Sequence, residues 1–102
     1  MRPKLDFRTA TLVEILAPDG KKVFSVKEEF SNGKYIHTGA IMMWGNGGGS
    51  VFYFTKQGAM VSARWLDSQN LEVTIEKGIT YSKRDDWAFN SGDKVDIQYK
   101  EI

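Results

Sequence analysis

The chain has 102 residues, 41% of them hydrophobic and 26% charged, and its formal net charge is +1. This balance argues against a nucleic-acid-binding surface, which needs an excess of Lys and Arg. The sequence contains no cysteine, which excludes disulfides, thiolate catalysis and thiolate-bound metals. A chain of this length builds one core, so we expect a single domain over residues 1–102, with residues 1–7 as a flexible N-terminal arm.

The first half of the chain predicts a meander of strands joined by turns. Residues 9–16 are rich in β-branched side chains, and residues 21–30 alternate between polar and apolar side chains. The Ala-Pro-Asp-Gly sequence of residues 17–20 has turn composition and joins these two strands in a hairpin. A third strand is expected over residues 34–44, where Gly39 predicts a bulge or a bend.

The faces of this third strand decide how its histidine is interpreted. We assign Ile36, Ala40 and Met42 to one apolar face, which leaves His37 on the other face as a partly exposed residue. His37 is the only histidine, and the acidic residues do not follow the spacing of a calcium loop. Because a metal site needs several convergent ligands, we expect neither a metal site nor a cofactor.

A run of glycines follows, in the sequence Met-Trp-Gly-Asn-Gly-Gly-Gly-Ser of residues 43–50. It begins like a dinucleotide-binding motif, but Ser50 stands where the third glycine is needed. A phosphate-binding loop would need a lysine directly before Ser50, and the next segment has the pattern of a strand instead of a helix. We therefore interpret this run as a long connection in which residues 47–49 are mobile and Trp44 lies at the base.

The second half of the chain predicts further strands and one irregular segment. Residues 78–92 are the least regular, and we expect a single helical turn over residues 83–87 there, capped by Ser82. Alternation of polar and apolar residues is clearest on either side of the turn at residues 67–70. Strands are expected over residues 50–55, 59–66, 71–77, 79–81 and 93–102.

The fold class that follows is all-β, with little or no helix. We expect a single small antiparallel domain of seven or eight strands, arranged as a sandwich, a small barrel or a curled, blade-like meander. No stretch approaches the ~20 apolar residues of a membrane-spanning helix, so no membrane span is expected.

Two segments resemble repeats of bacterial β-propellers. Residues 17–26 are similar to that family's Ser-Pro-Asp-Gly-Lys-Lys turn and apolar strand, with Ala17 in place of serine, and residues 61–75 are similar to the next repeat. The same pair of elements is similar to small exported or lipoprotein β domains of bacteria. A closed propeller needs at least four blades, so the resemblance implies a blade-like meander without catalytic residues. It also implies export to the periplasm or cell envelope if a leader is removed.

The candidate binding residues lie near the glycine run and in the irregular segment. Phe52 and Phe54 share a face that we assign to the core, which leaves the tyrosine between them for the surface. A pair of carboxylates beside a tryptophan suits a sugar or a cation. The candidates for binding a ligand or a partner are Trp44, Asn46, Tyr53, Asp85, Asp86 and Trp87.

No catalytic constellation is recognisable, and we assign no catalytic residue. The leading hypothesis is a non-enzymatic domain that binds another protein, or a second copy of itself, through a sheet edge, or acts as an accessory module of the cell envelope. The alternative is a small-ligand-binding or carbohydrate-binding domain that uses exposed aromatic residues near the glycine run. An enzyme based on Asp85 and Asp86 is the third hypothesis. A deep aromatic pocket would favour the ligand, and an exposed strand edge would favour the protein.

Overall fold

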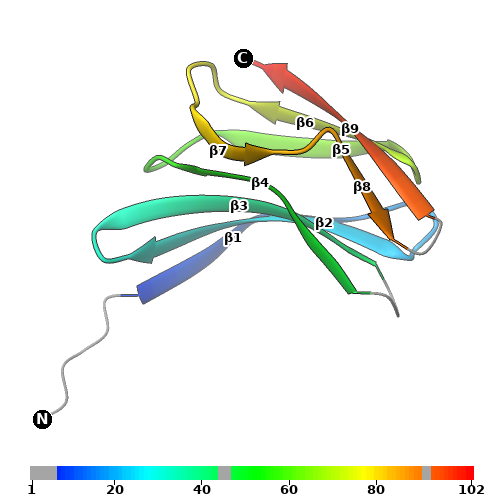
Figure 1. Ribbon diagram of the computed structural model, residues 1–102, viewed down its shortest axis with the longest axis horizontal. Coiled ribbons are helices and arrows are strands. Elements are labelled where there is room, and N and C mark those ends of the chain that lie inside the picture. Colours follow the sequence, from blue (N-terminus) through cyan, green and yellow to red (C-terminus); the bar gives the residue numbers. More distant parts are fainter. Residues whose placement is uncertain (1–6, 44–46, 91–92) are drawn as a thin grey trace, which may run out of the picture.

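The computed structural model describes residues 7–43, 47–90 and 93–102, and this part of the chain forms nine strands and no helix (Figure 1). The prediction of an all-β fold is confirmed, with one or two strands more than expected. The arm expected over residues 1–7 lies outside the described residues, except that Phe7 begins the first strand. The strands are β1 (Phe7–Leu16), β2 (Lys22–Ser31), β3 (Lys34–Met43), β4 (Gly47–Thr55), β5 (Val61–Asp67), β6 (Asn70–Ile75), β7 (Tyr81–Arg84), β8 (Trp87–Asn90) and β9 (Asp93–Glu101).

The strands form two sheets, one of five strands in the order β1-β2-β3-β4-β7 and one of four in the order β5-β6-β9-β8. In Figure 1, β1, β2 and β3 of the first sheet lie below, and β5, β6 and β9 of the second sheet lie above. The first four strands are an antiparallel meander, and its β2–β3 turn places Asn32 and Gly33 at φ angles of 53° and 78°. Positive φ at both positions is the geometry of a two-residue hairpin whose twist matches its strands.

The pairing of β6 with β9 is parallel, which the prediction of an antiparallel domain did not include. After β6 the chain crosses to the other sheet as β7 and returns as β8. The β8–β9 hairpin is antiparallel, so β9 comes back beside β6 in the same direction. The other strand pairs of both sheets are antiparallel.

The helical turn predicted over residues 83–87 is wrong, because this segment is where the chain changes sheets. Ser82 lies inside β7 and caps no helix. At the corner, Asp85 N donates to Val51 O at 2.7 Å, and Ile97 N donates to Asp86 O at 2.8 Å. Each of the two corner residues therefore bonds to a different sheet, and we call residues 85–86 the corner.

The core lies between the two sheets and uses the opposite face of β3 from the one predicted. His37 and Ile41 are buried on this strand, whereas Met42 is 51% exposed. Gly39 explains why this face of β3 is the buried one, because a Cβ atom at this position would lie 2.2 Å from Cε2 of Phe52. The Phe52 ring from β4 fills the place of the missing side chain. The β3–β4 register shifts between Gly39 and Ala40, but the extra residue is Val51 on β4, so the irregularity lies opposite Gly39 and not within β3, where it was predicted.

Two side chains tie the sheets together away from the corner. Trp65 on β5 donates its indole N–H to the carbonyl of Ile15 on β1, at 3.1 Å. Lys22 is buried, and its ammonium group contacts Asp19 at 2.6 Å and Asp93 at 3.1 Å and donates to the Ser68 carbonyl at 2.9 Å. The seam between β1 and β5 is thus bridged by the indole, and Lys22 connects two turns to the start of β9.

Candidate functional site

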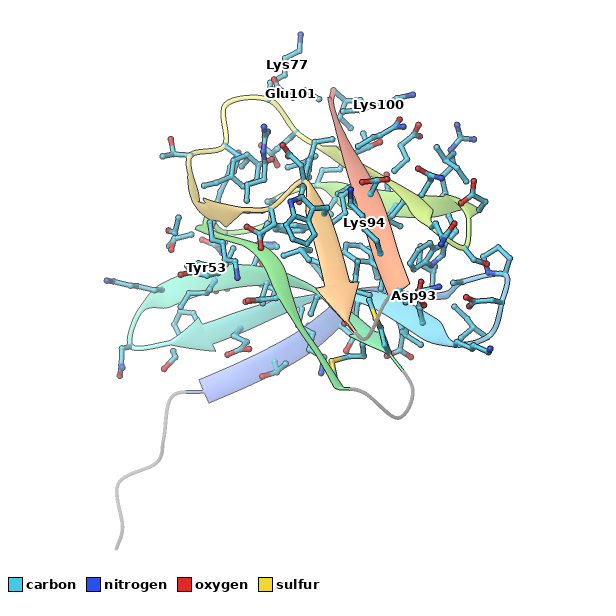
Figure 2. All side chains as sticks on the ribbon, turned by 45° about the vertical axis from the view of Figure 1, so that its right-hand side comes forward. Tyr53, Lys77, Asp93, Lys94, Lys100 and Glu101 are labelled. Atoms are coloured by element: carbon cyan, nitrogen blue, oxygen red, sulfur yellow. The ribbon has the colours of Figure 1, made fainter. Side chains whose placement is uncertain are left out.

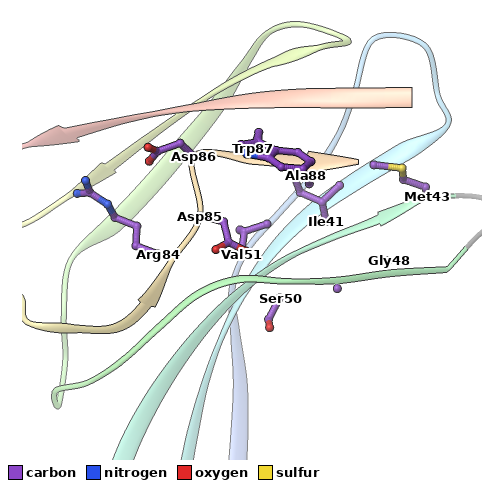
Figure 3. A pocket seen from close by; sticks show the side chains of 11 residues that line it. Ile41, Met43, Gly48, Ser50, Val51, Arg84, Asp85, Asp86, Trp87 and Ala88 are labelled. Carbon is purple, nitrogen blue, oxygen red and sulfur yellow. The ribbon is translucent and has the colours of Figure 1, made fainter. Parts of the chain in front are cut away.

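A groove of about 530 Å³ lies between the glycine-rich start of β4 and the corner (Figure 3). Ile41, Met43 and Val51 contribute apolar side chains to it, and residues 48–50 and 84–88 complete its lining. Figure 3 shows Trp87 on one side of the groove, Gly48 on the other, and Ile41 between them.

The groove exists because β7 pairs with only part of β4. The paired positions on β4 are Phe52, Tyr53 and Phe54, and the last backbone hydrogen bond is the one from Asp85 N to Val51 O. Residues 47–50 therefore have β3 on one side and no strand of the described chain on the other. The strand β8 is likewise the end of its sheet, with β9 as its single neighbour in the described residues. Two unpaired strand edges thus border one groove.

The glycine run is part of this wall, so its interpretation as a connection between strands is wrong for residues 47–49. These residues belong to β4 and pair with residues 41–43. A Cβ atom at Gly48 would lie 2.1 Å from the Ile41 carbonyl oxygen and 2.7 Å from Cα of Met42. At Gly49 no atom lies within 4 Å of a Cβ. Close approach to β3 therefore explains Gly48 but not Gly49, and the mobility expected for this run stays a prediction.

The structure brings three of the six candidate residues together. Asp85, Asp86 and Trp87 line the groove, and the Trp87 side chain is 54% exposed. Tyr53 is 40% exposed, in line with the expectation of a surface tyrosine, but it is not part of the groove lining. Figure 2 shows Tyr53 well to the left of β8 and β9.

The other two candidates, Trp44 and Asn46, lie outside the described residues.

The charges at the corner are unevenly paired. The carboxylate of Asp85 lies 3.6 Å from the Lys83 ammonium group. The Arg84 guanidinium carbon lies 4.8 Å from the centroid of the Tyr99 ring, a cation–π distance. Within the described chain, no cationic group lies at ion-pair distance from the Asp86 carboxylate, which is exposed to solvent.

Tyr99 positions the corner, a role that the sequence analysis missed. Its hydroxyl group donates to the Asp85 carbonyl at 2.7 Å. Burial raises the pKa of Tyr99, so its phenol keeps the proton that makes this bond. Tyr99 lies at the same spacing of two along β9 as the buried Val95 and Ile97, and its hydrogen-bond partner is a backbone atom of the segment before β8.

A second polar cluster surrounds His37, which was expected to be partly exposed and is instead completely buried. Its ring stacks on Phe54 with the centroids 4.8 Å apart, and Nε2 lies 3.2 Å from the Glu28 carboxylate. Glu28 also accepts a hydrogen bond from Gly58 N at 3.1 Å. Burial lowers the pKa of His37 although Glu28 opposes the shift. A completely buried imidazole cannot contact a substrate in this conformation, so we interpret His37 as a structural residue.

The remaining chemistry of the described residues is limited. They contain no group of three or more His, Asp or Glu side chains arranged to hold a metal ion. They also contain no helix long and apolar enough to cross a membrane. Models of protein families, curated proteins and solved structures were compared with this chain, and none of them matches it.

Proposed function

We propose that this chain is a non-enzymatic protein-interaction domain that binds its partner in the groove between β4 and β8. The observation that carries the proposal is the pair of unpaired strand edges beside one cavity. Unpaired backbone N–H and C=O groups of an edge strand are a template for a further strand, and recognition of peptides at sheet edges uses them.

The exposed Trp87 side chain supports the proposal, because tryptophan is prominent among the residues that dominate binding energy at interfaces. The buried side chains of Ile41, Met43 and Val51 form the apolar base of the groove, and Trp87 provides its exposed apolar surface. A rim of charged residues around an apolar centre is the usual anatomy of a protein-binding patch. The resemblance of two turn motifs to exported β domains supports an accessory role in the cell envelope as part of the same proposal.

A pull-down from the native source tests this function. The wild-type domain, a Trp87→Ala variant and a Met60→Ala variant would be used as bait, and the captured proteins compared. Met60 is an exposed apolar residue that is absent from the groove lining, so its variant is the matched control. We expect a partner that Met60→Ala retains and Trp87→Ala binds about 30-fold more weakly, as for a central interface residue. Equal capture by all three baits, or a monomer without partner in size-exclusion light scattering of the same sample, would contradict the proposal.

A second candidate function is the binding of a small ligand such as a sugar. The groove volume of about 530 Å³ falls in the range of small-molecule sites. An aromatic ring beside two carboxylates, Trp87 with Asp85 and Asp86, has the composition of a sugar site. Titration of the domain with a panel of monosaccharides and disaccharides, followed by tryptophan fluorescence, distinguishes the two functions. A saturable change that Trp87→Phe abolishes would favour the ligand over the protein.

A further inference from the structure

We infer that the groove takes a short extended segment of the partner, antiparallel to β4, with a cationic group at the N-terminal end of that segment. This inference rests on the proposed function, and it adds the mode of binding and the chemistry of the partner. It follows from the path of β7, from the space beside Gly49 and from the charges of the corner.

The path of β7 sets the direction of the segment. β7 runs antiparallel to β4, and its pairing ends where Asp85 N bonds to Val51 O. A partner segment that continues along residues 47–50 takes the place that β7 leaves empty, in the same direction. Its N-terminal end then lies beside the corner, and its C-terminal end lies toward Gly47. Four residues of β4 are available in residues 47–50, which corresponds to about 13 Å of strand.

The second wall of the groove selects an isolated segment over the sheet edge of a folded protein. The unpaired edge of β4 does not face open solvent, because β8 and the exposed Trp87 side chain form the other wall of the groove. A strand that is already part of a sheet would bring neighbouring strands against β8. A single extended peptide carries no such neighbours and can hydrogen-bond along β4 while its side chains contact Trp87.

The space beside Gly49 selects an apolar side chain on the inward face of the segment. Gly49 is paired with Ile41, so a side chain at position 49 would share the buried face of Ile41. No atom lies within 4 Å of a Cβ at this position, although Ile41, Met43 and Val51 line the groove around it. An apolar side chain of the partner fills this space, with Ile41, Met43 and Val51, which the chain itself already buries, behind it.

The charges of the corner select the cation. Both Asp85 and Asp86 line the groove at the end where the N-terminus of the segment would lie. Lys83 is 3.6 Å from Asp85, and Arg84 is placed over the rings of Tyr81 and Tyr99, so Asp86 keeps an unpaired charge within the described residues. A Lys or Arg side chain at the first position of the partner segment, or a free α-amino group, complements it.

Two capped peptides test the direction and the charge. Each alternates valine and threonine over about six residues, the length of a typical strand, and carries one lysine, at its N-terminal end in the first peptide and at its C-terminal end in the second. Binding is followed by amide chemical shifts and hydrogen exchange of residues 47–50 in the ¹⁵N-labelled domain. We expect the first peptide to bind more tightly by a factor of about three or more, a difference that Asp86→Asn removes. The factor is modest because exposed ion pairs contribute little. Slower exchange of the glycine amides would report the new backbone hydrogen bonds.

A variant of the groove tests the position. Gly49→Val adds a side chain whose Cβ atom meets no other atom within 4 Å, and the matched control Ser62→Val adds the same side chain to the exposed face of β5. We expect both variants to fold, which thermal unfolding would check, and we expect Gly49→Val alone to weaken peptide binding about tenfold or more by occupying the space of the inward side chain.

The outcomes separate this inference from the proposed function. Equal affinity for the two peptides, unchanged binding by Gly49→Val, or no amide shift at a peptide concentration of about 1 mM, the weak end of specific recognition, would overturn the inference. If the native partner is still captured in a Trp87-dependent way, the proposed function stands and its mode of binding differs. If neither the native partner nor a peptide binds, both fail.

Discussion

Adjacent glycines of β4 should respond to alanine in opposite directions. At Gly48 the new Cβ atom would lie 2.1 Å from the Ile41 carbonyl oxygen, so β4 has to move away from β3. Overpacking of this kind costs about 1–3 kcal/mol, and each backbone hydrogen bond lost between the two strands adds about 0.5–1.5 kcal/mol. We expect Gly48→Ala to lower the free energy of unfolding by about 2–4 kcal/mol, which lowers Tm by about 10 °C or more.

At Gly49 the same substitution meets no atom within 4 Å, and the backbone has no positive φ angle there. Alanine then restricts the unfolded chain more than the folded one, so Gly49→Ala should raise the free energy of unfolding by about 0.4–1 kcal/mol. Urea denaturation of the two variants and the wild type, with a common m-value, measures both effects. Equal stability of the two alanine variants would refute the described approach of β4 to β3.

Three further substitutions probe the ion pairs of Lys22, the buried histidine and the corner. Lys22→Met keeps the buried aliphatic stem but removes the cation between Asp19 and Asp93, and we expect urea denaturation to show a loss of about 1–3 kcal/mol. His37 has a lowered pKa, so the unfolded chain takes up a proton more readily than the folded chain, and the free energy of unfolding should fall as pH drops below 6.5. His37→Phe should remove this pH dependence between pH 6.5 and about 5, above the range of most carboxylates. Tyr99→Phe removes the hydrogen bond to the corner, and we expect a loss of about 1 kcal/mol in thermal unfolding together with weaker binding of the partner.

Local sequence patterns predicted the strands whose two faces differ in polarity. On β6, Leu71, Val73 and Ile75 are buried, as their spacing of two requires, and on β9 the same spacing places Val95 and Ile97 in the core. Turn composition located the first hairpin, because the backbone geometry of a turn depends on the few residues within it.

The features that the sequence did not predict depend on contacts between distant segments. The core face of β3 is set by the Phe52 ring that fills the space over Gly39, whereas a count of apolar side chains on β3 alone gives three on each face and does not decide between them. The change of sheet at residues 85–86 likewise depends on hydrogen bonds to Val51 and Ile97. No local pattern distinguishes such a corner from a polar loop.

The candidate site shows the same division between local and distant information. Asp85, Asp86 and Trp87 stand out in the sequence because carboxylates beside an aromatic residue are an unusual combination in an irregular segment. The wall opposite them comes from the glycine run of β4, which the sequence analysis treated as a connection between strands. The groove exists because β7 pairs with only part of β4 and then leaves it, and no local sequence pattern predicts this pairing.

Gly48 and Gly49 also bear on whether the unpaired edge of β4 at residues 47–50 has a function. The seam between β1 and β5 is bridged by the Trp65 indole, whereas the seam between residues 47–50 and β8 has no such bridge within the described chain. Close packing within the chain accounts for the glycine at position 48. It does not account for the glycine at position 49, where a Cβ atom would meet no other atom within 4 Å. An exposed edge is a liability that proteins usually protect, so the unpaired edge at residues 47–50 is consistent with the occupant that we propose.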